Sequence, residues 1–125
     1  MPLSSHMGHD VTVLVVDDDG DSVEAMREIL SAEGHRVLTA MNGRDALELT
    51  RREHPDLVLL DLEMPGMDGR SFLSELRSHA DVSDVPVVVV SGAVDAGDLG
   101  TESVRKPLRL DTLLGLIERV AMAGA

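Results

Sequence analysis

The sequence predicts an α/β fold, in which a doubly wound, five-stranded parallel sheet carries helices on both faces. Short apolar runs alternate with longer segments of helical period along the chain. The strongest runs are apolar throughout, as expected of parallel strands that are buried on both faces. Strands and helices in alternation favour right-handed crossovers, which place the helices on both sides of one sheet. A length of 125 residues, with 43% hydrophobic composition, fits one domain with a single core.

Five strands are expected, and their strength differs. The first, third and fourth runs consist almost entirely of Val and Leu, which is typical of buried strands too short to be helices. The second and fifth runs contain more polar residues and are weaker. The expected strands cover residues 11–16, 36–40, 57–60, 87–90 and 101–104.

Four helices are expected, and capping residues mark several of their ends. In the first, apolar residues recur every three or four positions and Gly34 supplies a stop signal. Asn42 is the expected N-cap of the second helix, which ends before Pro55, and Asp68 is a candidate cap for the third. The expected segments are residues 21–34, 43–54 and 110–122, together with a third helix that follows Asp68 and carries Phe72, Leu73 and Leu76.

One segment does not fit the alternation of strands and helices. Between Ser91 and Lys106 lies the sequence GAVDAGDLGTESVR, which contains three glycines and few strong helix formers. The fourth and fifth strands of a parallel sheet need a crossover connection, which is usually a helix. We therefore expect this fourth helix of the sheet to be short or missing.

Composition excludes several functions. A formal net charge of −12 argues against a nucleic-acid partner held through its phosphates. Cysteine is absent, which excludes disulfides and thiol chemistry and is compatible with the cytoplasm. The longest apolar runs are far shorter than the roughly 20 residues of a membrane span. Residues 1–10 show no apolar period and are expected to be an expression leader, so the domain is predicted over residues 11–122.

Polar side chains stand at the ends of four of the expected strands. Asp17 and Asp18 follow the first strand, Asp61 the third, Ser91 the fourth, and Lys106 the fifth. The carboxyl ends of parallel strands meet at one edge of the sheet, so these groups are expected to lie together. Carboxylate oxygens suit Mg²⁺, and an ammonium and a hydroxyl can stabilise charge on a phosphoryl group. The predicted cluster is thus suited to a divalent metal and a phosphoryl group.

Each of these residues also has a simpler structural interpretation. Aspartate often follows a strand because it caps the next helix, and Asp18, Asp19 or Asp21 can serve that purpose alone. Three consecutive acids also leave the metal-binding pair open between Asp17 with Asp18 and Asp18 with Asp19. The first pair is favoured because it directly ends the apolar run. Only the joint placement of the acids, the serine and the lysine favours a functional site.

The chain resembles the receiver domains of two-component response regulators, which have a flavodoxin-like fold. The resemblance covers nearly the whole ordered chain, about residues 11–120, and rests on four motifs in one order. These motifs are VLVVDDD, DLVLLDLEMPGMDG, VVVVSG and RKP.

The resemblance implies a role for each residue of the predicted cluster. Asp61 corresponds to the phosphoacceptor, which receives a phosphoryl group from the phosphohistidine of a sensor histidine kinase or phosphotransfer protein. Asp17 and Asp18 correspond to the acidic pair that binds Mg²⁺ together with Asp61. In addition, the backbone carbonyl of Glu63 corresponds to a further metal ligand. Ser91 corresponds to the switch hydroxyl, and Lys106 to the lysine before a proline, whose peptide bond is often cis in this family.

Two departures from the family affect how a signal is transmitted. Relatives usually carry an aromatic switch residue three positions before the lysine, where this chain has Ser103. Ser91 and Lys106 are also 15 positions apart (106 minus 91), about seven residues fewer than in typical relatives. The resemblance therefore predicts a complete phosphorylation site and an altered route from that site to an output.

The leading hypothesis is a Mg²⁺-dependent phosphoacceptor that forms and hydrolyses its own acyl phosphate and is not a turnover enzyme. Its expected location is the cytoplasm, and its output partner is unknown. One alternative is an interaction module with a receiver fold that works without phosphorylation, motivated by Ser103 and the short fourth segment. A weaker alternative is a Mg²⁺-dependent phosphatase with Glu63 as general acid, although the chain has no cap domain to select a substrate. No membrane partner and no direct contact of this domain with nucleic acid are expected.

Overall fold

The computed structural model describes residues 11–62, 69–92 and 101–123, and these residues form one parallel sheet flanked by helices. The sheet contains five strands in the order β2-β1-β3-β4-β5. The strand order reverses at β1, because the chain first adds β2 on one side and then β3 on the other. The strands are β1 (Thr12–Val16), β2 (Arg36–Ala40), β3 (Leu57–Asp61), β4 (Val87–Ser91) and β5 (Glu102–Arg105).

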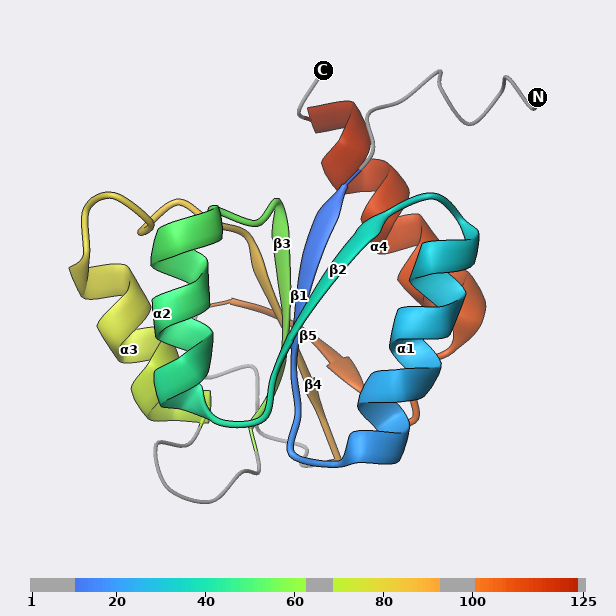
Figure 1. The fold of residues 1–125 in the computed structure, drawn as a ribbon, viewed down its shortest axis with the longest axis horizontal. Helices are drawn as coiled ribbons and strands as arrows, with labels where there is room; N and C mark the ends of the chain where they lie inside the picture. The colour runs from blue at the N-terminus through green and yellow to red at the C-terminus, as the bar shows by residue number, and fades with distance from the viewer. Residues whose placement is uncertain (1–10, 63–68, 93–100, 124–125) are drawn as a thin grey trace.

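Helices cover both faces of the sheet, as Figure 1 shows. On one face lie α2 and α3, and on the other lie α1 and α4. The doubly wound architecture predicted from the alternation of strands and helices is therefore confirmed. Among the described residues, no helix has the length and apolarity that crossing a bilayer would need. The helices are α1 (Gly20–Ala32), α2 (Gly43–Glu53), α3 (Gly69–Ser78) and α4 (Leu110–Ala123).

The helix ends follow the predicted capping residues in two cases. The side chain of Asn42 accepts a hydrogen bond from the backbone N–H of Asp45 at 2.9 Å and caps α2. Helix α1 ends at Ala32, and Gly34 follows with a φ of 89°, a left-handed conformation that glycine adopts without strain. Asp68, the candidate cap of α3, lies outside the described residues. The closing helix extends one residue beyond its predicted end at Met122.

The segment expected to hold a shortened fourth helix is described only at its ends. Residues 93–100 lie outside the described part of the chain, so the short or missing helix stays a prediction. The helix labelled α4 in Figure 1 is the predicted closing helix, which follows β5. Residues 1–10 also lie outside the described ranges, and their assignment as a leader is likewise untested.

The central strands bury side chains on both faces, which gives the sheet two cores. Leu14 and Leu60 pack on the side of α2 and α3 with Phe72, the only aromatic residue of the chain. Val13 and Leu59 pack on the opposite side with residues of α1 and α4. Successive residues of a strand point to opposite faces, so a continuous apolar run serves both layers.

β3 and β4 each end one residue later than the apolar runs predict, and β5 is shifted by one residue from the expected 101–104. Asp61 is the last residue of β3 and pairs with Val90, while Ser91 is the last residue of β4 and pairs with Arg105. The apolar pattern underestimates these strands because backbone pairing continues through the polar residue. Both polar side chains are consequently attached to backbone that the sheet holds in place.

Candidate functional site

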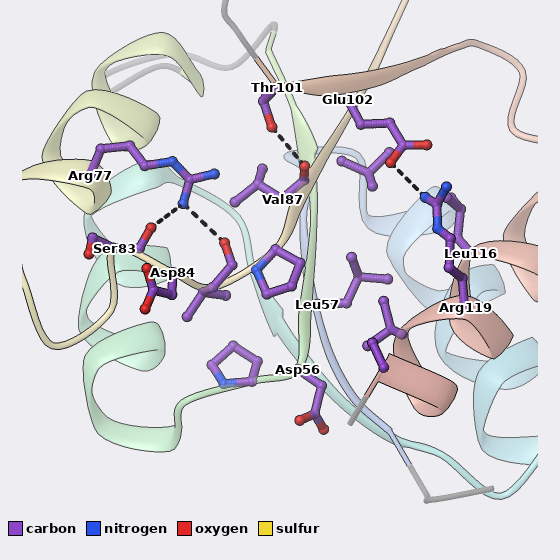
Figure 2. A pocket seen from close by; sticks show the side chains of 16 residues that line it. Asp56, Leu57, Arg77, Ser83, Asp84, Val87, Thr101, Glu102, Leu116 and Arg119 are labelled. Carbon is purple, nitrogen blue, oxygen red and sulfur yellow. Dashed lines mark hydrogen bonds and ion pairs between the residues drawn. The ribbon is translucent and has the colours of Figure 1, made fainter. Parts of the chain in front are cut away.

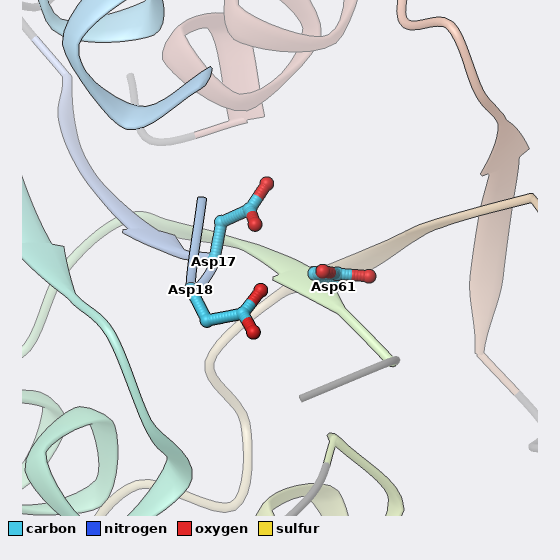
Figure 3. Close-up of side chains that lie close together, drawn as sticks. All are labelled: Asp17, Asp18 and Asp61. Atoms are coloured by element: carbon cyan, nitrogen blue, oxygen red, sulfur yellow. The ribbon is translucent and has the colours of Figure 1, made fainter. Parts of the chain in front are cut away.

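Three carboxylates converge at the carboxyl edge of the sheet, where the strand order reverses. Asp17 and Asp18 follow β1, and Asp61 ends the neighbouring β3 (Figure 3). One carboxylate oxygen from each lies within 4.8 Å of the others. This is the one such acidic group in the described parts of the chain. Ligands of doubly wound sheets bind at such a reversal point, outside the carboxyl ends of the strands.

Asp61 is the most buried of the three acids. Only 4% of its surface is exposed, because it continues the β3 ladder between β1 and β4. Asp17 is half-buried, and its backbone N–H donates to the Ala40 carbonyl at 3.1 Å. Asp18 is exposed. Exposure to solvent therefore increases from Asp61 through Asp17 to Asp18.

The folded protein disfavours the charged form of Asp17. Burial raises the pKa of this carboxyl above its ordinary value of 3.8, and the nearby negative charge of Asp61 raises it further. The backbone N–H of Asp19, which donates to Asp17 Oδ1 at 3.0 Å, and the Lys106 ammonium oppose this rise. A divalent cation placed among the acids would relieve the same repulsion.

Asp19 has a different structural role from Asp17 and Asp18. Its side chain caps α1 by accepting hydrogen bonds from the N–H of Asp21 at 3.1 Å and the hydroxyl of Ser22 at 3.0 Å. The Ser22 hydrogen bond is the main reason why the pKa of Asp19 lies below its ordinary value. The geometry therefore brings Asp17 and Asp18 to the acidic group and uses Asp19 at the helix end.

Ser91, at the end of β4, and Lys106, just after the edge strand β5, reach the same edge of the sheet. Lys106 Nζ lies 3.3 Å from Asp61 Oδ1, and the Lys106 backbone N–H donates to the Ser91 carbonyl at 2.9 Å. The peptide bond between Lys106 and Pro107 is cis. Ser91 is 1% exposed and stands at the end of β4, beside β3. All five predicted side chains thus occupy one edge of the sheet. Glu63 lies outside the described residues.

Gly69, which the sequence analysis did not identify, packs against the backbone that carries Asp61. A Cβ atom on Gly69 would lie 2.7 Å from Leu62 Cα and 2.8 Å from the carbonyl oxygen of Asp61. Its backbone N–H also donates to the Leu62 carbonyl at 3.4 Å. The sequence shows a glycine at this helix start, in MDG, but a glycine at a helix start does not by itself indicate close packing.

The donor set at the edge fits Mg²⁺. All three donors are carboxylate oxygens, which hard cations prefer. Oxygens that share one Mg²⁺ at about 2.1 Å are at most about 4.2 Å apart, so the observed group needs only a small adjustment to bind one ion. Asp61 and Asp17 would supply ligands from the two strands, and Asp18 would supply one from the solvent side.

A cavity of about 700 Å³ opens beside the acids between α1 and the start of α4. Asp17 and Lys106 contribute to its wall, together with apolar residues of both helices such as Met26 and Leu110. The site is therefore accessible to a reactant from this side of the molecule.

A slightly larger cavity, of about 790 Å³, lies at the opposite edge of the sheet (Figure 2). Its two arginines are already bound: Arg77 donates to the carbonyls of Ser83 and Val85 at 2.9 and 3.0 Å, and Arg119 pairs with Glu102 at 2.6 Å. The acids lie at the other ends of the strands, so size does not identify the functional site here.

Comparison with known proteins identifies the family. Residues 13–117 match the family model of the response regulator receiver domain. Protein PilH of Pseudomonas aeruginosa is 34% identical over 115 residues, which cover 86% of this chain and 95% of PilH. Response regulator MprA of Mycolicibacterium vanbaalenii is 40% identical over 111 residues, which cover 83% of this chain and only 47% of MprA.

A solved structure supports the fold independently of close sequence similarity. The receiver domain of a sensor histidine kinase from Pseudomonas aeruginosa, solved with a magnesium ion coordinated in its active site cleft, superimposes with a TM-score of 0.81. Its identity is 22%, and the match covers 91% of this chain and 99% of that one. On its fold, motif order and family match, the chain belongs to the response regulator receiver domains, the phosphoacceptor family of two-component signalling.

Proposed function

We propose that Asp61 is the phosphoacceptor of this receiver domain and that Asp17, Asp18 and Asp61 bind the Mg²⁺ required for the transfer. One observation carries the proposal. A buried carboxylate at a strand end has two other carboxylates within 4.8 Å and an ammonium 3.3 Å away. That combination concentrates negative ligands for a cation and keeps a positive group beside the oxygen that would react.

The chemistry assigns one task to each group. An Asp61 oxygen attacks the phosphorus of a phosphohistidine whose other ring nitrogen carries a proton, the P–N bond breaks, and neutral imidazole leaves with the bonding electrons. Lys106 balances charge on the phosphoryl oxygens, and the Ser91 hydroxyl donates a hydrogen bond to one of them. The bound Mg²⁺ supplies charge neutralisation between the carboxylates and the incoming phosphoryl group.

Support for Mg²⁺ comes from the ligand set and from the family. The three acids offer only hard oxygen ligands, and the related receiver domain from a Pseudomonas aeruginosa histidine kinase holds magnesium in its cleft. A further ligand, the backbone carbonyl of Glu63, rests on the resemblance to the family alone. We assign no turnover of an outside substrate, because the acyl phosphate would form and hydrolyse on the chain itself.

The proposed phosphodonor is a sensor histidine kinase or a histidine phosphotransfer protein. The family supports this class of partner without identifying one, and a cytoplasmic location stays a prediction. The chain covers about half of MprA and nearly all of PilH, so relatives include both longer and equally short proteins. The relatives therefore do not indicate whether the output is a further domain or a separate protein.

Phosphate uptake from a small donor tests the proposed function. Incubation with phosphoramidate and Mg²⁺ should add the mass of one phosphoryl group to the intact protein, and EDTA should prevent the addition. The Asp61→Asn variant should take up no phosphate. Asp84→Asn is the matched control, because Asp84 is exposed at the opposite edge of the sheet. Equal labelling of the wild type and Asp61→Asn would refute the assignment of Asp61.

A further inference from the structure

The start of α3 is packed directly against the end of β3. Gly69 is the first residue of α3 and is buried, and its missing side chain leaves no free space. The three atoms nearest to an added Cβ would be Leu62 Cα at 2.7 Å, the Asp61 carbonyl oxygen at 2.8 Å and Leu62 Cδ2 at 2.9 Å. Two of these three belong to the backbone, which cannot rotate away as a flexible side chain can.

Gly20 provides an internal comparison, because it is the first residue of α1. A Cβ on Gly20 would meet nothing within 4 Å. Neither glycine has a positive φ, so backbone conformation does not require glycine at either helix start. Both glycines are the first residue of a helix, but only Gly69 is closely packed.

Helix α3 cannot easily retreat from an added methyl group. Phe72 and Leu76 lie three and seven positions after Gly69 on the same helix face, and both are fully buried in the core beneath the sheet. Leu62 is buried in the same core, but it lies just beyond the last residue of β3 and outside its ladder. A displacement caused at Gly69 would therefore fall first on the backbone of Leu62 and reach Asp61 through the peptide unit that joins them.

We propose that Gly69 is a positioning residue for phosphoryl transfer: by having no side chain, it lets α3 hold the Asp61–Leu62 backbone at the place where the Asp61 carboxylate reacts. The inference rests on the proposed role of Asp61. Transfer depends on aligning the attacking oxygen with phosphorus, so a small shift of this backbone slows the reaction even though every reactive group is present.

Gly69→Ala and the matched variant Gly20→Ala test the proposal in the full chain. Both substitutions remove a glycine from the first helical position, and both variants should remain folded by circular dichroism. With phosphoramidate and saturating Mg²⁺, Gly20→Ala should label within about twofold of the wild type, whereas Gly69→Ala should label about tenfold more slowly. In metal-free ¹⁵N NMR spectra, the amide signals of Asp61 and Leu62 should move only in Gly69→Ala.

A second substitution separates backbone from side-chain packing. Leu62→Val in the Gly69→Ala background removes Cδ2 but leaves both backbone contacts, so the labelling rate should stay low. Recovery of the wild-type rate would assign the effect to side-chain packing and overturn the proposal. An unfolded Gly69→Ala would also overturn it, because the glycine would then serve stability.

The two proposals fail in different ways. If the wild type takes up no phosphate, the proposed function is wrong, and the metal-free amide signals still report whether Gly69 positions Asp61. If the wild type labels and Gly69→Ala labels equally fast with unmoved signals, only the positioning role is wrong.

Discussion

At the carboxyl edge of the sheet, Asp61 ends a strand that is buried along its whole length, whereas Lys106 follows a strand that is largely exposed. Every residue of β3 and β4 is buried, but β5 has three exposed residues and one half-buried residue. β5 also pairs only with β4, because it lies at the edge of the sheet. The carboxylate is therefore fixed by the core, and its ammonium partner is supplied by the less protected side of the molecule.

β5 is held by its ladder with β4 and by contacts at its two ends. The Thr101 hydroxyl donates to the Val87 carbonyl at 2.9 Å before the strand, and the Lys106 N–H donates to the Ser91 carbonyl at 2.9 Å after it. In between, Glu102 pairs with Arg119 of α4 on an exposed surface. Ser103 is exposed. We infer that changes in β5 affect the pairing with Asp61 more readily than they affect folding.

The largest expected effect is a loss of stability that depends on whether the substitution lies in β3 or in β5. Leu60 is fully buried, so Leu60→Ala should lower the free energy of unfolding by about 2–5 kcal/mol through lost packing and a residual cavity. Ser103→Ala in the exposed β5 should change it by less than about 0.5 kcal/mol. Urea unfolding followed by circular dichroism measures both, since the chain has no Trp or Tyr. Similar losses would contradict the contrast between the strands.

Addition of Mg²⁺ should raise the free energy of unfolding by nearly as much as Leu60→Ala lowers it. At a free Mg²⁺ concentration of 100 times its Kd, the free energy of unfolding should rise by about 2.7 kcal/mol, because the ion binds the folded chain only. The measurement is urea unfolding with Mg²⁺ or EDTA at matched ionic strength. Asp18→Asn should reduce the gain, whereas Arg119→Ala should keep it. A gain that survives Asp17→Asn, Asp18→Asn and Asp61→Asn alike would place the ion elsewhere.

Removal of the ammonium should have a smaller effect. Lys106→Met keeps the apolar stem but removes the ammonium 3.3 Å from Asp61 Oδ1, which should cost about 1 kcal/mol without metal because the lysine is partly exposed. Arg109→Met is the control, since its pairing with Asp111 at 3.3 Å is far more exposed. Chemical denaturation in EDTA compares the two. No loss in Lys106→Met would show that solvent already screens the pair.

The architecture was largely predictable because it depends on hydrophobic period, whereas the details of the site depend on tertiary contacts. The runs that include Leu59 and Val89 are apolar at every position, and Thr12 alone interrupts the run that includes Val13, as expected of a sheet covered on both faces. Spacing could not separate Asp17 from Asp19, because either can accept backbone hydrogen bonds. That choice follows from where the chain turns into α1.

The packing of Gly69 was not predictable for a related reason. The close approach joins the start of α3 to the end of β3, and glycines occur at helix starts without such contacts, as Gly20 does. The unequal burial of β3 and β5, in contrast, was indicated by composition, because the run before Asp61 is apolar and the run before Lys106 is mostly polar. Patterns of local period contain no information about distances between elements.

The smallest expected effect is that of Asp17→Asn on the free energy of unfolding, and its sign depends on pH and on Mg²⁺. The folded protein raises the pKa of Asp17 by burial and by the nearby Asp61, so the folded chain binds a proton more tightly there than the unfolded chain does. The free energy of unfolding therefore falls as pH rises from the ordinary pKa of 3.8 through the raised one. Asp17→Asn removes this penalty and should stabilise the metal-free protein at pH 7 by about 0.5 kcal/mol.

Asp19 provides the opposite sign within the same three-residue run. The Ser22 hydroxyl lowers its pKa, so its contribution is present above 3.8 and is lost as pH falls through the lowered value. Asp19→Asn should therefore destabilise at neutral pH, and the two variants should diverge in EDTA across a pH series of thermal unfolding. With Mg²⁺ the order of Asp17→Asn and the wild type should reverse, because only the wild type keeps the full ligand set. Destabilisation by Asp17→Asn in EDTA would mean that its hydrogen bond to the Asp19 N–H outweighs the repulsion from Asp61.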